Sequence, residues 1–373
     1  MKPSEQTKPA NLEQERDAFV EQMLSSTRGA FEIYTIHMGH KLNFYRTLAE
    51  SAALTAPQLA QRTSTHSRYV REWLEQQTVA GILGVENSEA NAYERRYFLP
   101  ESRSEVLTSP DSLNYLAPLA QLVVGATRPV SEVIKAFRNG GGVSFDSYGE
   151  DVRAGVAHLN RPMFLELLGT EWLPSITDIH QRLVSDPPAK VADIGCGTGW
   201  SSIGIAKAYA NVSVDGYDMD APSIEQARMN ATEAGLDKRV QFHVHDASDP
   251  SIPGTYDLVT AFECIHDMAN PVGALRTMLT LAGDKGSVIV MDERTADSFT
   301  PQGNEIEALL YGFSVLACLP AGMSEKPSAQ TGTVMRPDTL SKYATEAGFC
   351  QIGILPIDNY FFRFYRLRQN CLR

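Results

Sequence analysis

A short apolar strand runs directly into a glycine-rich turn at residues 190–200 (KVADIGCGTGW). This stretch limits what the chain can fold into more than any other. Gly195, Gly197 and Gly199 stand at alternate positions, and glycine allows both a tight turn and a ligand lying against the backbone. Residues 201–210 place apolar side chains at helical spacing, so the loop joins a strand to the start of a helix. The pattern predicts an α/β domain that binds a ligand at the carboxyl end of this strand.

The spacing of the glycines separates this loop from other glycine-rich loops. G-x-G-x-G is not the G-x-G-x-x-G of dinucleotide-binding folds, and no Gly-Lys-Ser/Thr follows, as a P-loop requires. Asp193 stands just before the glycines, and no lysine stands directly after them. An acid without a lysine suits a cofactor that carries an ammonium group and no phosphate. S-adenosylmethionine has that chemistry.

Two later strands supply partners for such a cofactor. Asp218 ends the predicted strand 212–218, where a carboxylate can accept hydrogen bonds from both hydroxyls of a ribose. Met219 is placed to lie on an adenine face. The predicted strand 240–245 leads into Asp246 and Ala247, where an acid can accept the adenine amino group. A single acid at a strand end is usually just a polar residue, but three such features on successive strands favour a cofactor site.

Composition narrows the class of protein. The 373 residues suffice for two domains, and 43% hydrophobic and 21% charged residues are typical of a soluble protein. A net charge of −12 argues against general affinity for nucleic acid or anionic membranes. Five scattered cysteines give no sign of a disulfide framework or a metal site. With no apolar leader and no evident run of about 18 apolar residues, we expect a cytoplasmic protein.

The chain divides into four parts. Residues 1–11 read as a loose tail. Residues 12–110 are predicted to form a winged helix-turn-helix domain. Its expected elements are one or two helices with an apolar face over 12–40, helices over 41–50, 55–62 and 67–80, and a hairpin over 81–100. Thr55 and Ser67 are expected to begin the last two helices. Residues 111–187 read as a helical connector with an irregular loop at 139–151. Residues 188–373 alternate between strands and helices, with a long insertion at 296–349.

Seven strands are expected in the last part, over 190–194, 212–218, 240–245, 256–265, 286–293, 351–356 and 361–367. Only four residues separate the last two strands, so these form a hairpin and one of them must run antiparallel to the rest. The predicted fold class is therefore α/β: a Rossmann-like, seven-stranded sheet with a reversed last strand, preceded by an all-α, winged-helix domain.

With these features in place, residues 190–293 resemble a class I S-adenosylmethionine-dependent methyltransferase. From about Phe31 onward, the chain resembles a bacterial group of small-molecule methyltransferases in which a winged-helix domain precedes that fold. The matching stretches are RYVREWLEQQ, SYGED, VADIGCGTGWSS, TAFECIHDMANPVGALR and TGTVMRPDTL. The resemblance implies S-adenosylmethionine as cofactor, S-adenosylhomocysteine as product and a homodimer. The expected cofactor contacts are Asp193, Gly195, Gly197, Gly199, Asp218, Met219, Asp246, Ala247 and Glu263.

The candidate catalytic residues follow the fourth strand. His266 and Asp267 stand at its carboxyl end, and a histidine can take a proton from a hydroxyl acceptor near neutral pH. In the plant-type small-molecule O-methyltransferases that this stretch resembles, a His-Asp pair at this position contains the base. The alternative is a structural histidine that caps the following helix, with Asp267 as a cap or an orienting partner.

Two segments are expected to enclose the acceptor. In the resembling group the 139–151 loop folds over the cofactor, so Tyr148 is a third catalytic candidate, with a buried aromatic anchor as the alternative. The insertion at 296–349 lies where acceptor specificity normally resides. Core packing is the alternative for Tyr311 and Met323. The candidate acceptor contacts are Phe145, His158, Arg161, Tyr311, Met323 and Arg336.

Three functions remain open. The first is transfer of a methyl group to a small molecule, at oxygen, with His266 as general base. The second is S-methylation of a thioether or thiol, as in dimethylsulfoniopropionate synthesis, which needs no base for a thioether. The third is a transcription regulator that binds S-adenosylmethionine. Residues 1–110 carry 12 basic and 14 acidic side chains, which does not favour DNA binding. Dimerisation is the expected role of this domain.

Overall fold

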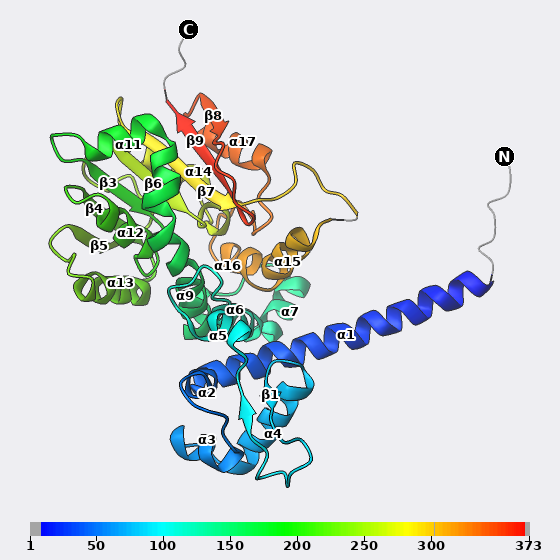
Figure 1. The fold of residues 1–373 in the computed structure, drawn as a ribbon. Coiled ribbons are helices and arrows are strands. Elements are labelled where there is room, and N and C mark those ends of the chain that lie inside the picture. The colour runs from blue at the N-terminus through cyan, green and yellow to red at the C-terminus, as the bar shows by residue number, and fades with distance from the viewer. Residues whose placement is uncertain (1–8, 302, 370–373) are drawn as a thin grey trace, which may run out of the picture. The chain divides into compact units, whose positions relative to one another are not determined.

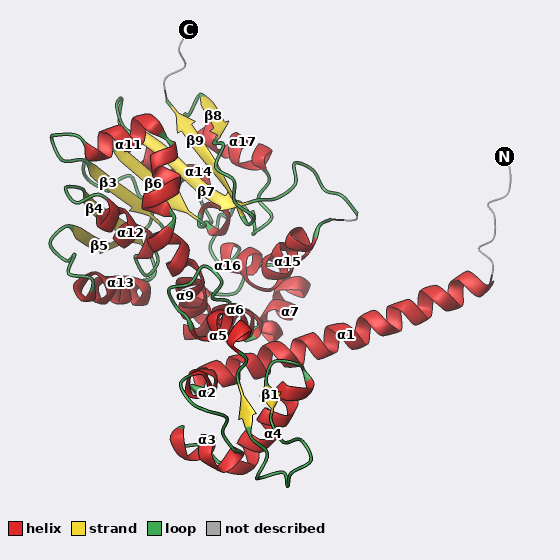
Figure 2. Ribbon diagram, viewed as in Figure 1, coloured by secondary structure: helices red, strands yellow, loops and turns green. Residues whose placement is uncertain are grey.

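The computed structural model describes residues 9–301 and 303–369. The chain forms two compact units, Met1–Val124 and Gly125–Arg373 (Figures 1 and 2). The boundary between them falls inside the predicted connector 111–187. Residues 1–8 of the predicted tail lie outside the described residues, and residues 9–11 belong to the first helix rather than to a tail.

The first unit is helical apart from one short hairpin. Strands β1 and β2 pair antiparallel, with Gly84 opposite Phe98, as expected for the wing. Thr55 caps α3 with a full capping box, in which its side chain and that of Gln58 each bond to the other's backbone. The elements are α1 (Pro9–Lys41), α2 (Phe44–Ala49), α3 (Ala56–Arg62), α4 (Ser67–Val79), β1 (Gly84–Val85), β2 (Tyr97–Phe98), α5 (Glu101–Thr108) and α6 (Ala117–Thr127), which crosses into the second unit.

Residues 12–40 form one continuous helix, α1, which is one of the two predicted possibilities, and most of the large apolar side chains along it are exposed within this unit. Two other local predictions for this unit need correction. Helix α2 begins at Phe44 rather than residue 41, because Asn43 takes a left-handed conformation with φ of 57° and breaks the helix. His66, not Ser67, is the N-cap of α4, and its ring accepts a hydrogen bond from the Arg68 amide.

The second unit alternates strands and helices after a helical lead-in. Its elements are α7 (Val130–Asn139), α8 (Phe145–Tyr148), α9 (Glu150–Glu166), η1 (Leu168–Trp172), α10 (Leu173–Ser175), α11 (Thr177–Val184), β3 (Lys190–Ile194), α12 (Trp200–Ala208), β4 (Ser213–Asp218), α13 (Ala221–Glu233), β5 (Val240–Val244), β6 (Leu258–Phe262), η2 (Ile265–Asp267), α14 (Pro271–Ala282), β7 (Ser287–Glu293), α15 (Glu305–Phe313), η3 (Ser314–Cys318), α16 (Leu319–Gly322), α17 (Pro337–Ala347), β8 (Gln351–Ile354) and β9 (Phe362–Arg368). The seven predicted strands are confirmed, with ends shifted by a few residues.

The strands form one sheet in the order β5-β4-β3-β6-β7-β9-β8. The first five are parallel, and β9 runs antiparallel between β7 and β8, which confirms the reversed last strand. From β3 the chain winds outward to β4 and β5, then returns to β6 on the other side of β3. Ligands in open α/β sheets bind at this point of reversal, outside the carboxyl ends of the strands. Gly195 and Glu263 stand at those ends.

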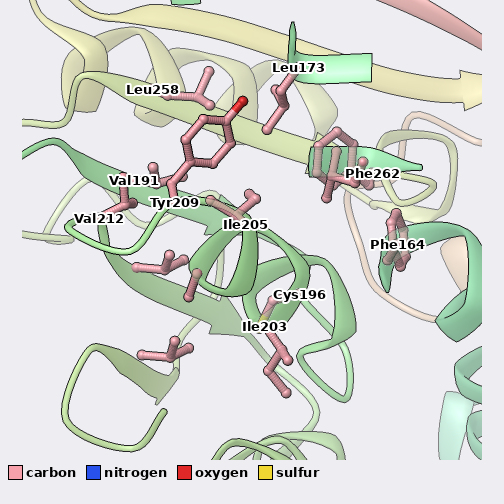
Figure 3. Packing of buried hydrophobic residues seen from close by; sticks show 14 of the residues in the cluster. Phe164, Leu173, Val191, Cys196, Ile203, Ile205, Tyr209, Val212, Leu258 and Phe262 are labelled. Carbon is pink, nitrogen blue, oxygen red and sulfur yellow. The ribbon is translucent and has the colours of Figure 1, made fainter. Parts of the chain in front are cut away.

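Apolar side chains alternate along the strands and build a core on each face of the sheet. Val191 and Ile289 belong to one cluster, which α9 to α13 cover. Their neighbours Ala192 and Val290 belong to the other, which α14 and α17 cover. Figure 3 shows part of the first cluster, which includes Ile203 and Ile205 of α12 together with Val191, Cys196 and Phe262.

The insertion at 296–349 is more helical than predicted. Helix α15 continues through η3, a π-helical turn, into α16, and α17 completes the segment. Residues Glu305–Gly322 are long and apolar enough to cross a membrane by length and composition alone, which the sequence analysis did not anticipate. Among the cysteines, Cys196, Cys264 and Cys318 are free thiols, whereas Cys350 is disulfide-bonded, contrary to the expectation from spacing.

Candidate active site

The three glycines after β3 have different structural roles, although all have positive φ (67°, 52° and 83°). A Cβ on Gly195 would lie 2.6 Å from the Cys264 sulfur, and one on Gly199 would lie 2.4 Å from the Phe242 ring. Both positions therefore exclude larger residues because of packing. A Cβ on Gly197 would have no neighbouring atom within 4 Å. Gly197 thus exposes bare backbone to open space, which is the position a ligand needs.

Asp193 is buried under the loop and holds it in place. One carboxylate oxygen accepts hydrogen bonds from Ser201 and Ser202 at 2.6 and 2.7 Å, and the other accepts one from Thr260 at 2.8 Å. Burial raises the pKa of this carboxyl, and the three hydroxyls partly oppose that rise. Its predicted contact with the cofactor stays a prediction. The hydrogen bonds favour an indirect role, in which Asp193 ties the glycine loop to α12 and β6.

Asp218 lies at the carboxyl end of β4, beside the glycine loop. Its Oδ2 accepts a hydrogen bond from the Gly197 amide and its Oδ1 accepts one from the Asp220 amide, each at 2.9 Å. Burial raises the pKa of the carboxyl. Met219, the next residue, has a largely exposed side chain. The structure thus brings together the acid, the bare backbone of Gly197 and an exposed thioether at one edge of the sheet.

The third predicted contact lies in the turn after β5. Asp246 accepts hydrogen bonds from the backbone and hydroxyl of Ser248, at 2.8 and 3.0 Å. Ala247 packs against the core cluster on the α14 face. Since β5 is the neighbour of β4 and parallel to it, this turn lies at the same edge of the sheet as Asp218.

His266 lies at the same edge, in η2 after β6, and is 3% exposed. Its Nδ1 is 2.7 Å from Oδ1 of Asp292 and 3.0 Å from Oε2 of Glu293, both at the end of β7. Its Nε2 is 3.2 Å from Oδ1 of Asp267. Burial alone would lower the pKa of the imidazole, but the charges of Asp267, Glu293 and Asp292 outweigh it and raise the pKa well above its usual value.

Sequence reasoning missed Asp292 and Glu293. Nothing near residue 266 signals a partner 26 residues away, although the parallel pairing of β6 with β7 places their carboxyl ends together. Two groups with metal-ligand chemistry share this histidine, one with Asp267 and Cys318 and one with Asp292 and Glu293. Each of the three carboxylates lies within ion-pair distance of His266, while Oδ2 of Asp292 and Oε2 of Glu293 are buried without a hydrogen-bond partner. The absence of a metal site remains an expectation.

Glu263 occupies a strained position at the end of β6. It is a non-glycine residue with φ of 55°, and such conformations persist where the surroundings enforce them, often at functional sites. Its carboxylate accepts a hydrogen bond from the Asn160 amide. Burial raises the pKa of Glu263 to about 7, with the charge of His266 acting in the opposite direction. This hydrogen bond brings Asn160 of α9 to the carboxyl end of β6.

The 139–151 loop ends in α8, which carries Phe145 and Tyr148. The Tyr148 side chain is fully buried, and its hydroxyl donates to the carbonyl of Leu316 at 3.0 Å. This geometry favours the anchoring interpretation, while a contact with the cofactor stays a prediction. Phe145 is partly exposed and its ring stacks under the Arg153 guanidinium, 5.1 Å from centre to centre.

Arg153 was not among the predicted site residues, yet it connects α8 to the start of α13, which follows Asp218 at the carboxyl edge of the sheet. Its guanidinium makes a bidentate pair with Asp220, at 2.8 and 2.7 Å, and a further contact with Asp146 at 2.6 Å. Asp220 is the N-cap of α13, two residues after Asp218. Further along α9, His158 is exposed, and the Arg161 guanidinium lies 4.7 Å over the ring of Trp200.

Of the three predicted acceptor contacts in the insertion, Tyr311 and Arg336 lie in contact with each other. Arg336 donates from Nη1 to Oε1 of Glu307 at 2.9 Å, and from Nη2 to the Tyr311 hydroxyl at 3.2 Å. The buried Glu307 therefore balances the arginine charge. Met323 follows α16 and is half-buried.

Two family models match the chain. One, described as a methyltransferase domain, matches residues 185–340, and one, described as an Rv2258c-like winged HTH domain, matches residues 31–109. Among curated proteins, norajmaline N-methyltransferase of Rauvolfia serpentina is 28% identical over 142 residues, covering 36% of this chain and 48% of its own length. Ubiquinone biosynthesis O-methyltransferase of Azoarcus sp. strain BH72 is 28% identical over 163 residues, covering 43% and 63%. The matched part of the chain thus spans about half or less of the length of the first curated relatives.

Solved structures match over nearly the whole chain. Mitomycin 7-O-methyltransferase MmcR covers 96% of this chain and 99% of its own, with 18% identity and a TM-score of 0.70. The O-methyltransferase NcsB1 from neocarzinostatin biosynthesis, in complex with S-adenosylmethionine and 2-hydroxy-5-methyl naphthoic acid, covers 90% and 95%, with 16% identity and a TM-score of 0.63. At these identities the likeness establishes the fold. Together with the two matched models, it shows that the chain contains a methyltransferase domain, over residues 185–340, that follows a winged-helix domain, over residues 31–109.

Proposed function

We propose that the protein transfers a methyl group from S-adenosylmethionine to a hydroxyl of a small-molecule acceptor, with His266 as general base. The observation that carries this proposal is the anchoring of the His266 ring. Asp292 and Glu293 engage Nδ1 from β7, which leaves Nε2 as the nitrogen that an acceptor hydroxyl can approach. A third group, Asp267, stands 3.2 Å from Nε2.

The residues at the sheet edge fit S-adenosylmethionine. Gly197 offers open backbone, Asp218 offers a carboxylate for ribose hydroxyls, and Met219 offers an exposed apolar side chain for the adenine. We place the adenine amino group near Asp246 and Ala247, and the methionine portion between the glycine loop and Glu263. When bound, the cofactor supplies a methyl carbon on a positively charged sulfur, and a carboxylate at Glu263 favours that charge.

In this mechanism the chain's residues align the acceptor and remove its proton. The acceptor hydroxyl gives its proton to Nε2 of His266. Its oxygen then bonds to the methyl carbon as the carbon–sulfur bond breaks, and the electron pair of that bond stays on sulfur, which leaves S-adenosylhomocysteine. The residues around the site exclude water and hold the two reactants in line. Asp292 stabilises the imidazolium that forms.

Replacement of His266 tests the base role. His266→Ala should lower turnover by roughly 10²–10⁴-fold and leave the affinity for S-adenosylmethionine nearly unchanged. His180→Ala is a matched control, because His180 pairs with Tyr209 in the same unit and is not among the candidate site residues. A folded His266→Ala enzyme with near-full activity would exclude His266 as base.

One observation favours the second candidate, S-methylation. The three carboxylates raise the pKa of His266 well above its usual value, which favours the protonated imidazole, and a protonated ring cannot accept another proton. A thioether acceptor has a free lone pair and needs no base. In that case loss of His266 should cost only about tenfold, through misplacement of the acceptor. Product analysis with labelled methyl groups, over hydroxyl and thioether acceptors, separates the two candidates.

We assign acceptor recognition to the insertion and to the start of the second unit. The proposed acceptor contacts from the start of the second unit are Phe145 of α8 and His158 and Arg161 of α9. Those from the insertion are Tyr311, Met323 and Arg336. The relatives include both N- and O-methyltransferases. The pairing of Arg336 with Glu307 makes this arginine a positioning group for Tyr311 rather than an anchor for an anionic acceptor.

We propose that the winged-helix domain mediates homodimerisation and does not read DNA. Residues 1–110 carry more acidic than basic side chains. Within the first unit, exposed apolar residues follow the length of α1, and surfaces of this kind usually contact a partner. These residues are Leu12, Phe19, Val20, Met23, Leu24, Phe31, Tyr34 and Met38. We expect the protein to act in the cytoplasm; the free thiols of Cys196, Cys264 and Cys318 agree with a reducing compartment, whereas the disulfide at Cys350 does not.

A further inference from the structure

The candidate base is covered on the side that the reaction needs. His266 is 3% exposed, although an acceptor must reach its Nε2. The Asp267 carboxylate lies 3.2 Å from Nε2, and the half-buried Cys318 thiol lies within 4.8 Å of a ring nitrogen of His266 and of that carboxylate. Cys318 therefore lies beside the ring that the acceptor hydroxyl would have to reach.

Cys318 belongs to a cover that lies directly on η2. It is the last residue of η3, and α16 continues from it across η2, so close that a Cβ on Gly322 would lie 3.0 Å from the Asp267 carbonyl. Behind α16, the Val143 amide donates to the Pro320 carbonyl at 2.9 Å. Residues 314–322 thus lie against η2, which carries His266, and we refer to them as the cover.

The cover contains an irregular helical turn. η3 is a π-helical turn, and such turns shift the backbone hydrogen bonds out of the i→i+4 register, are rare and often mark functional sites. The carbonyls of Leu316 and Ala317 in this turn accept from the Tyr148 hydroxyl, at 3.0 and 3.3 Å. This hydroxyl comes from α8, more than 160 residues earlier in the chain.

We propose that the cover opens to admit the acceptor, and that the Tyr148 hydroxyl is the latch that holds it shut with Cys318 against His266. Tyr148 is then a positioning residue, which acts on the base through η3 and makes no contact with the cofactor. This inference rests on the proposed function for the role of His266. The opening itself does not depend on which acceptor is methylated.

The Cys318 thiol reports the opening directly. Burial raises its pKa to about 12, so the closed thiol reacts slowly with N-ethylmaleimide, whereas an open cover would expose a thiol with an ordinary pKa. The experiment measures the labelling rate at Cys318 by peptide mass spectrometry, in the full-length protein without cofactor or acceptor. Cys318→Ser confirms the assignment of the labelled peptide.

Tyr148→Phe removes the latch and keeps the buried ring. We expect it to raise the labelling rate at Cys318 by about threefold to tenfold, the factor for one hydrogen bond, and to leave the rate at Cys264 unchanged. Tyr209→Phe is the matched control: it also deletes a buried tyrosine hydroxyl with one partner, His180, and should leave Cys318 unaffected.

The outcomes separate this inference from the proposed function. Equal labelling of Cys318 in folded Tyr148→Phe and wild type overturns the latch, whatever the enzyme methylates. A rise at both Cys318 and Cys264 indicates general loosening and also overturns it. In turnover with an identified acceptor, Tyr148→Phe should change KM for the acceptor and leave the affinity for S-adenosylmethionine unchanged. A weakened cofactor affinity instead assigns Tyr148 to the cofactor.

Discussion

Replacing Gly197 with valine should abolish binding of S-adenosylmethionine while the protein stays folded. The new Cβ meets no protein atom within 4 Å, so it creates no clash in the ligand-free protein. The remaining cost is the positive φ of 52°, about 1–2 kcal/mol of unfolding free energy. The side chain would occupy the space against which the cofactor must lie.

The loop cannot yield to make room. The Gly197 amide is bonded to Asp218, and its neighbours Gly195 and Gly199 are wedged against Cys264 and Phe242. We therefore expect the dissociation constant to rise at least about 100-fold, or about 3 kcal/mol. Titration calorimetry with S-adenosylmethionine or S-adenosylhomocysteine measures this change.

Gly235→Val is the matched control for backbone strain. Gly235 follows α13, has φ of 68° and likewise has no atom within 4 Å of a built Cβ. Both variants should lose similar stability in denaturant titrations, and only Gly197→Val should lose the cofactor. Unchanged affinity in folded Gly197→Val would refute the assignment of this loop, and an equal loss in both variants would show that strain alone weakens binding.

Three further predictions concern Asp218, pH and assembly. Asp218→Ala should weaken cofactor binding by about 1–3 kcal/mol in calorimetry, because it removes a charged hydrogen-bond acceptor and leaves the Gly197 amide without its partner. An affinity within twofold of wild type would contradict the proposal that Asp218 binds the ribose hydroxyls. The rate of methyl transfer to a hydroxyl should rise as pH rises through the raised pKa of His266, and a flat pH–rate profile would point to a sulfur acceptor. Thermal stability should fall over the same rise in pH. The reason is that His266, Glu293 and Glu263 have raised pKa values in the folded state (about 7 for Glu263), so the folded state binds more protons than the unfolded state and is favoured at lower pH. Phe19→Glu combined with Met23→Glu should convert a dimer into a monomer in sedimentation experiments, and a wild-type protein that is monomeric at every concentration would contradict dimerisation through α1.

The sheet could be predicted from sequence because its signals are local. Each central strand is a short apolar run between turn residues, and β3 has the predicted bounds, Lys190–Ile194. The reversed β9 followed from the four residues between two strands, since so short a connection cannot cross over a sheet. Thr55 was identified as a cap because the capping signal lies within three residues.

The site was only partly predictable, because its contacts join distant residues. Arg153 and Asp220 are 67 positions apart, and Tyr148 reaches Leu316 across 168. No spacing rule connects such residues, and each looked like an ordinary surface or core position. The π-helical turn at 314–318 is likewise invisible to periodicity, because its residues continue the apolar pattern of α15. Asn43 was missed because its left-handed φ depends on packing rather than on a glycine.

The place of β9 in the sheet has a consequence for synthesis. β8 pairs only with β9 among the described strands, and β7 has β9 as its outer neighbour. Until Phe362–Arg368 has left the ribosome, β7 is therefore an open edge of buried, apolar residues, which is a template for pairing with other chains. The nascent chain therefore depends on β9 for protection, so chaperone binding before β9 emerges should govern the yield of folded protein.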